Sequence, residues 1–301
     1  AIEAIGYTDP TLIQQKAIPP IINGQDVLGI AQTGTGKTAA YLLPIIKKLG
    51  FAQDQIPRAV ILAPTRELAM QIEENTISLC QFTDLRIGAV YGGLGPKPQK
   101  EMLAKGIDIL IATPGRLLEL YLAGDLVFKK LQVLVLDEAD EMLSMGFKDE
   151  LDQILNALSS VENKWLFSAT IPEGIEQIVK KHLSKDAIHI KVGGKDVVNQ
   201  KIQHQFLVCD EKDKFYILTE FLKTEKNNRG VIFCKTKVAT QKLTKQLIAK
   251  NVLADCIHGD LQQREREKAM RAFKNKSVQI LVATDVAARG IDIEALSYVV
   301  H

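Results

Sequence analysis

The stretch Asp26-Val27-Leu28-Gly29-Ile30-Ala31-Gln32-Thr33-Gly34-Thr35-Gly36-Lys37-Thr38 decides the fold. An apolar run leads into a glycine-containing loop, and the helix-forming residues 39–43 follow, so we predict a strand, a tight turn and a helix. Gly34 and Gly36 lack a Cβ, which lets the backbone turn and approach a ligand closely. The free N–H groups of such a loop and of the following helix start suit an anionic phosphate. An ordinary turn before a helix is the alternative.

The eight residues 31–38 of this loop are the candidate nucleotide site. Lys37 is expected to reach the β- and γ-phosphates of ATP, and the Thr38 hydroxyl to bind Mg²⁺. The general phosphate-loop pattern has glycine where this chain has Ala31. The combination of Gly36, Lys37 and Thr38 between a strand and a helix nevertheless favours phosphate binding over a plain turn.

The length and composition predict two globular domains. A chain of 301 residues exceeds the usual size of one domain, and its 46% apolar and 25% charged residues are typical of soluble proteins. Four widely spaced cysteines show no metal-ligand spacing, which indicates reduced thiols and a cytoplasmic protein. No apolar run is long enough to span a membrane. The net charge is −4 for residues 1–192, with 19 basic and 23 acidic residues, and +6 for the rest, with 19 and 13. This basic second part suits either a polyanionic partner or a solvated surface.

Short β-branched runs alternate with helical patterns along the chain. This alternation predicts an α/β fold with two domains in tandem, each a mainly parallel sheet with helices on both faces. We place the first domain at 1–192, a flexible linker at 193–199 and a C-terminally incomplete second domain at 200–301. Thr11 is expected to cap a helix over 12–22. Strands are expected at 58–62, 87–91, 107–112, 133–136, 164–167, 188–192, 203–209, 230–233, 254–257, 279–283 and 298–300.

The second motif is acidic: Asp137-Glu138-Ala139-Asp140 follows the buried strand expected at 133–136. Ligands of open parallel sheets bind beyond the carboxyl ends of strands, which places Asp137 to hold Mg²⁺ through water. Glu138 is expected to orient and deprotonate the attacking water. Lys37, Asp137 and Glu138 are thus the candidate catalytic residues. A solvated acidic helix start is the alternative.

Two further expected strands are each followed by a turn with a capping residue and an arginine. Pro64, Thr65 and Arg66 follow one strand, and Thr113, Pro114 and Arg116 follow another, each with a capping residue at a helix start. Free N–H groups and an arginine at both turns, with Gly92 and Gly93 between them in the sequence, indicate contact with a nucleic-acid backbone. Simple capping explains each turn taken alone.

Two weaker signals concern single side chains. The Gln14 amide can both donate and accept, as pairing with adenine requires. The hydroxyls of Ser168 and Thr170 are expected to bond Asp140 and to relay the nucleotide state to the second domain, with capping as the alternative.

Taken together, these motifs resemble those of the DEAD-box ATP-dependent RNA helicases over nearly the whole chain. Residues 6–14 match the family's adenine motif, and residues 137–140 match the motif that gives the family its name. Residues 31–38 match the family's first motif, which also has alanine at the position of Ala31. Residues 64–69, 92–93 and 113–116 match its RNA motifs, and 168–170 its coupling motif. In the second domain, 231–236, 258–266 and 283–292 match later motifs.

The resemblance implies two RecA-like domains with ATP between them and RNA across both. It implies that Gln14 reads adenine beside Tyr7, and that Gly290 and Asp292 contact ATP, the latter at the ribose. It also implies that Gly93, Thr236, Gly259 and Thr284 touch RNA, and that domain closure separates short duplexes locally. The expected cofactors are ATP and Mg²⁺; the expected partner is RNA, bound mainly through its backbone, with no membrane.

The family's sixth motif, which carries arginines for the transferred phosphate, is expected beyond His301. We therefore expect residues 1–301 alone to bind ATP with little RNA-stimulated turnover, and a chain extended at its C-terminus to regain it. Two rival functions remain: a DNA-directed helicase of the same superfamily, and a non-catalytic, ATP-gated RNA clamp.

Overall fold

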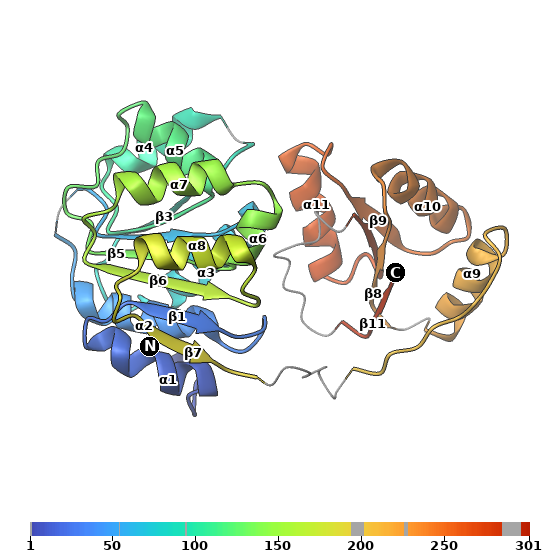
Figure 1. Cartoon of the computed structure of the whole chain (residues 1–301). Coiled ribbons are helices and arrows are strands. Elements are labelled where there is room, and N and C mark those ends of the chain that lie inside the picture. Colours follow the sequence, from blue (N-terminus) through green and yellow to red (C-terminus); the bar gives the residue numbers. More distant parts are fainter. Residues whose placement is uncertain (1, 54, 94, 194–201, 226–227, 285–295) are drawn as a thin grey trace. The chain divides into compact units, whose positions relative to one another are not determined.

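The computed structural model describes residues 2–53, 55–93, 95–193, 202–225, 228–284 and 296–301. The chain divides into two compact units, Ala1–Val197 and Val198–His301 (Figure 1). The expected linker at 193–199 lies outside the described residues apart from Gly193.

The first unit is built on a seven-stranded parallel sheet in the order β3-β4-β2-β5-β6-β1-β7. Its strands are β1 (Val27–Ile30), β2 (Ala59–Leu62), β3 (Ile87–Val90), β4 (Ile109–Ala112), β5 (Val133–Leu136), β6 (Asn163–Ser168) and β7 (Ile188–Lys191). Its helices are η1 (Glu3–Ile5), α1 (Leu12–Ile22), α2 (Lys37–Leu49), α3 (Arg66–Leu79), α4 (Pro96–Ala104), α5 (Pro114–Leu122), α6 (Ala139–Ser144), α7 (Lys148–Ala157) and α8 (Glu173–His182).

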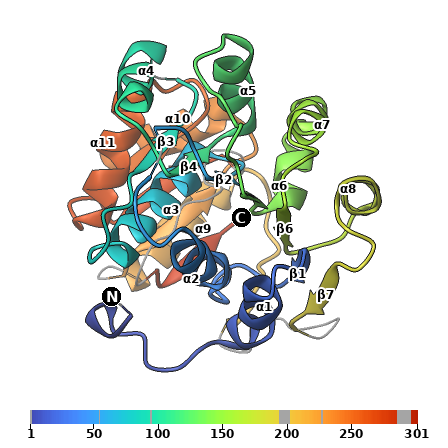
Figure 2. The ribbon, with the colours of Figure 1, turned by 90° about the vertical axis from the view of Figure 1, so that its left-hand side faces the viewer.

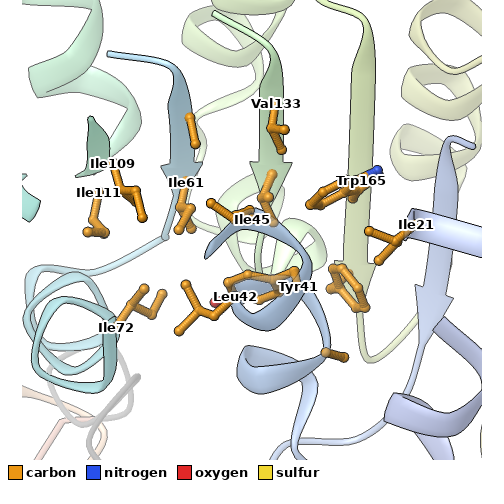
Figure 3. Packing of buried hydrophobic residues seen from close by; sticks show 14 of the residues in the cluster. Ile21, Tyr41, Leu42, Ile45, Ile61, Ile72, Ile109, Ile111, Val133 and Trp165 are labelled. Carbon is orange, nitrogen blue, oxygen red and sulfur yellow. The ribbon is translucent and has the colours of Figure 1, made fainter. Parts of the chain in front are cut away.

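Alternate residues of the strands β1 to β6 face two separate cores. Val133 and Val135 of β5 pack with α1, α2 and α3, whereas Leu134 and Leu136 pack with α4 to α8. Figure 2 shows helices of these two groups on opposite sides of the strands, and Figure 3 shows the first core around Tyr41. Because both faces are covered, these strands are mostly apolar, whereas the edge strand β7 alternates apolar residues with the exposed His189 and Lys191.

The second unit has a four-stranded parallel sheet in the order β11-β8-β10-β9. Its elements are α9 (Lys214–Thr224), β8 (Gly230–Phe233), α10 (Lys237–Ala249), β9 (Ala254–Ile257), α11 (Gln263–Lys274), β10 (Ile280–Ala283) and β11 (Tyr298–Val300). Helix α11 covers one face of the sheet, and α9 and α10 cover the other. The predicted fold class, two α/β units with helices on both faces, is confirmed.

The strand predicted at 203–209 is wrong. These residues form neither a helix nor a strand, and Phe206 is 92% exposed. The apolar run Phe206-Leu207-Val208-Cys209 suits a strand, but a strand also needs a neighbouring backbone to bond. No ladder in the described part of the second unit includes this segment. All other predicted strands are present, with bounds that differ by at most two residues at either end.

Candidate functional site

All parallel strands of the first unit end at one edge of its sheet, which gathers the loop after β1, the acidic residues after β5 and the hydroxyls after β6. Strand β6 lies between β1 and β5, with Ile30 opposite Ser168 and Leu136 opposite Leu166. The candidate residues after these strands, up to 139 positions apart in sequence (Ala31 to Thr170), are therefore neighbours at one sheet edge.

The loop at 31–38 is closed by its own lysine. Lys37 is 6% exposed, and its Nζ donates a 2.9 Å hydrogen bond to the Ala31 carbonyl across the loop. Gly34 and Gly36 have φ of +79° and +87°, a conformation that side chains with a Cβ rarely adopt. A Cβ on Gly36 would also fall 2.6 Å from Gln14 Nε2. The loop therefore needs glycine at position 36 for two separate reasons.

Gln14 joins the start of α1 to the end of this loop. Its Oε1 accepts from the Thr11 N–H at 3.0 Å, and its Nε2 donates to the Gly36 carbonyl at 3.1 Å. An amide has two acceptor lone pairs and two N–H groups. One of each remains, which is the pair that adenine N6 and N7 require. Gln14 and the exposed Tyr7 both line a hollow of about 750 Å³ beside α1, α2 and the end of α3.

Asp137 is held by two donors. Its Oδ1 accepts from the Glu138 N–H at 3.0 Å, and its Oδ2 accepts from the Tyr41 hydroxyl at 2.8 Å. The carboxyl is 3% exposed. Burial raises its pKa, and the positive charge of Lys37 and the Tyr41 hydrogen bond partly oppose that effect. The sequence analysis missed Tyr41, because only the folded chain brings it to Asp137.

Glu138 has the backbone and the pKa of a functional residue. Its φ of +51° and ψ of +50° are left-handed, which costs free energy for a residue with a side chain and is common at active sites. Burial, followed by the charge of Asp137, raises the pKa of Glu138 to about 7. A carboxyl that titrates near neutral pH can accept a proton efficiently from a reacting group.

Asp140 is bonded to the strand end at 168–170. Its Oδ2 accepts from the Thr170 N–H at 2.8 Å and from the Thr170 hydroxyl at 2.7 Å, and its own N–H donates to Ser168 Oγ at 3.2 Å. Burial alone would raise the pKa of Asp140, but these hydrogen bonds outweigh it and the pKa is lowered. The expected contact between Asp140 and Thr170 is thus present, and its relay role stays a prediction.

The candidate RNA residues of the first unit also follow strands at this sheet edge. Thr65 caps α3 by accepting from the Leu68 N–H at 3.2 Å, and Pro114 occupies the first turn of α5. The Arg66 guanidinium lies so close to Gly93 that a Cβ there would overlap it, and the Gly93 φ of +86° also requires glycine. Arg66, the first of the two candidate arginines, therefore lies against Gly93 of the predicted glycine pair.

Gln99 of α4 joins the second arginine to the same glycine region and was not predicted. Its Nε2 donates to the Tyr91 carbonyl at 2.9 Å, and its Oε1 accepts from Arg116 Nη1 at 3.3 Å. Arg116 is 8% exposed and also pairs with Glu119 at 3.1 Å. Its guanidinium therefore offers less surface to a phosphate than that of the half-buried Arg66.

In the second unit, Thr236, Gly259 and Thr284 each follow the carboxyl end of a strand of its own sheet. Thr236 caps α10 by accepting from the Ala239 N–H at 3.2 Å, and the Thr284 N–H donates to the Ile257 carbonyl at 3.2 Å. The other two predicted ATP contacts, Gly290 and Asp292, lie outside the described residues.

Both units of the chain are similar to known helicases. Residues 11–178 match the family model described as DEAD/DEAH box helicase, and residues 213–301 match that of the helicase conserved C-terminal domain. The chain is 41% identical over 295 residues to the DEAD-box ATP-dependent RNA helicase RhpA of Helicobacter pylori, covering 98% of this chain and 59% of RhpA. It is 38% identical to the ATP-dependent RNA helicase DbpA of Bacillus subtilis, covering 100% and 62%. The chain thus spans about three fifths of these curated relatives.

Solved structures give the same result. A DEAD box protein from Methanococcus jannaschii is 40% identical, with a TM-score of 0.60 over 99% of this chain and 80% of that one. Dbp5 of Saccharomyces cerevisiae, solved with RNA and ADP BeF3, is 30% identical, with a TM-score of 0.88 over 99% and 76%. No helix in the described residues is long and apolar enough to cross a bilayer. Because one family model alone matches more than half of the chain, the protein belongs to the DEAD/DEAH box helicase family.

Proposed function

We propose that the protein is an RNA-stimulated ATP hydrolase that locally separates short RNA duplexes. The observation that carries this proposal is the buried group after β1 and β5: a lysine on the phosphate loop, a buried aspartate, and a glutamate whose pKa is raised to about 7. A phosphate-binding loop facing an acidic strand end is the arrangement that phosphoryl transfer uses.

Each residue of this group has a proposed task. The N–H groups of residues 31–38 and the Lys37 ammonium bind the phosphates, for which Lys37 exchanges its bond to the Ala31 carbonyl for phosphate oxygens. Glu138 orients the attacking water and accepts its proton as the water oxygen bonds to the γ-phosphorus, while the bond from that phosphorus to the β,γ-bridging oxygen breaks and ADP leaves. Gln14 selects adenine with the donor and acceptor that remain free after its bonds to Thr11 and Gly36.

Mg²⁺ fits the oxygen donors that the site offers. The described residues contain no cluster of three or more His, Cys, Asp or Glu side chains that would form a metal cage. Mg²⁺ is commonly bound by one or two carboxylates together with waters and substrate phosphates, so Thr38 and Asp137 suffice. When bound, the ion would neutralise charge on the phosphates.

RNA is the proposed partner, contacted mainly at its phosphates and 2′-hydroxyls. The contacts are Pro64, Thr65, Arg66, Gly93, Thr113, Pro114 and Arg116 in the first unit and Thr236, Gly259 and Thr284 in the second. Helix starts with free N–H groups read the backbone without reading the bases. We further propose that the protein acts in the cytoplasm, since its four cysteines are free thiols.

The test is ATP hydrolysis by the full-length protein without nucleic acid, with single-stranded RNA, and with DNA of the same sequence. Stimulation by RNA and not by DNA is expected. Glu138→Gln should keep ATP binding and lose at least about 10²-fold in turnover, the scale of a missing general base. Equal stimulation by DNA would favour a DNA-directed helicase, and binding of ATP and RNA without turnover would favour a clamp.

A further inference from the structure

Tyr41 places a hydroxyl group inside the ATP site. The residue lies one turn after Thr38 on α2, so the two side chains share one helix face. Tyr41 is completely buried, and its hydroxyl donates to Asp137 Oδ2 at 2.8 Å, across 96 residues of sequence. The phenol therefore contacts one candidate Mg²⁺ ligand, Asp137, and lies one helical turn from the other, Thr38.

The aromatic ring of Tyr41 is fixed by the core. It packs against Phe167 with ring centroids 5.4 Å apart and an angle of 50°, in the cluster that also contains Ile45 and Trp165 (Figure 3). A phenylalanine would fill the same ring volume. The hydroxyl is therefore not needed to fill the core, and its effect can be separated from that of the ring.

The contact also leaves Asp137 able to serve the metal. A carboxylate has about four lone-pair positions, and the Glu138 N–H and the Tyr41 hydroxyl use one on each oxygen. The carboxylate cannot rotate without breaking one of these two bonds. It still has a lone pair on each oxygen for a water of the ion.

We propose that Tyr41 is a positioning residue for Mg²⁺, whose hydroxyl holds the Asp137 carboxylate in the orientation that the metal–nucleotide complex requires, next to Thr38 on the same helix face. The proposal rests on the proposed function, since it assumes that these two residues serve Mg²⁺. Hydrogen-bond partners behind metal ligands commonly change metal affinity by 10- to 100-fold when they are removed.

The test is Tyr41→Phe in residues 1–301, measured as equilibrium binding of a fluorescent ATP analogue at increasing Mg²⁺ and, separately, in EDTA. The variant should require about tenfold or more Mg²⁺ to reach half of the metal-dependent gain in affinity. Its affinity in EDTA should stay within about twofold of the unmodified chain, because the phosphate loop and Gln14 are intact. The control is Tyr121→Phe, which removes the hydroxyl of a partly exposed ring that packs on Phe128 and should change neither value.

Two results would overturn the proposal. An unchanged Mg²⁺ requirement would show that the hydroxyl does not position the ligands. An equal loss of affinity with Mg²⁺ and in EDTA would show that Tyr41 supports the fold of the site and not the metal. Failure of the proposed function is distinguishable from both, because the unmodified chain would then show no Mg²⁺-dependent binding of the nucleotide.

Discussion

Lowering the pH from 8 to 6 should slow ATP hydrolysis about tenfold through Glu138. A general base must be ionised to accept a proton, and burial together with Asp137 raises the pKa of Glu138 to about 7. With that pKa, about nine tenths of the carboxyl is ionised at pH 8 and about one tenth at pH 6. The rate should therefore be present above pH 7 and be lost as the pH falls through 7. An unshifted glutamate would stay ionised over this whole range.

The assay is kcat/KM for RNA-stimulated hydrolysis by the full-length protein, at saturating RNA, excess Mg²⁺ and constant ionic strength. This quantity reports the ionisation of groups in the enzyme before ATP binds. Glu138→Gln is the control, and its residual rate should be low and should no longer titrate near pH 7. A profile that is flat from pH 6 to 8, or a midpoint near 4.5, would refute the role assigned to the burial of Glu138.

The same shift has the opposite effect on folding. Glu138 binds its proton more tightly in the folded chain than in the unfolded chain, where its pKa is near 4.5. Its contribution to the free energy of unfolding is therefore complete below pH 4.5 and is lost as the pH rises through about 7. Glu138 is therefore ionised, and able to act as a base, only in the pH range in which its charge lowers the free energy of unfolding.

Four further changes test the binding residues. Lys37→Ala should weaken ATP binding itself, since it removes a buried cation from the phosphates; titration with a fluorescent ATP analogue checks this, and unchanged affinity would contradict it. Gln14→Ala should remove a preference for ATP over GTP in competition binding, because guanine has an acceptor where adenine has its N6 amine; equal affinities for ATP and GTP in the unmodified chain would refute this. Arg66→Ala should weaken RNA binding equally for all sequences and lower the salt slope by about 1, and a sequence-selective loss would mean that it reads bases. Arg116→Ala should act in the same direction, but part of its effect should be a lower thermal stability, since it breaks the bonds to Gln99 and Glu119.

The bounds of strands were predicted most accurately from the sequence where helices cover both faces of the strand. β5 has the predicted bounds because four consecutive apolar residues face two cores, and α1 begins at the predicted cap. The segment 203–209 also ends in four consecutive apolar residues, but whether a strand forms depends on a neighbouring backbone. Pattern alone cannot supply that information.

The residues of the candidate site also fall into two groups, those that the local sequence predicts and those that only the folded chain brings together. Lys37, Asp137 and Glu138 were predictable because their roles follow from local spacing around strand ends. Tyr41 and Gln99 were not, since each acts through a contact that exists only after the sheet has ordered its strands. The left-handed backbone of Glu138 was equally hidden, because nothing in its local sequence requires it.

The most direct test of the central claim is the affinity for RNA with and without a bound ATP analogue. A coupled ATP- and RNA-binding protein must bind each ligand more tightly in the presence of the other, and by the same factor. Fluorescence anisotropy of a labelled single-stranded RNA, titrated with the full-length protein, gives one factor, and titration of the analogue with and without RNA gives the other. The account predicts two equal factors of at least about 5, the lower end of usual coupling energies. An RNA affinity that does not change with the nucleotide would contradict it.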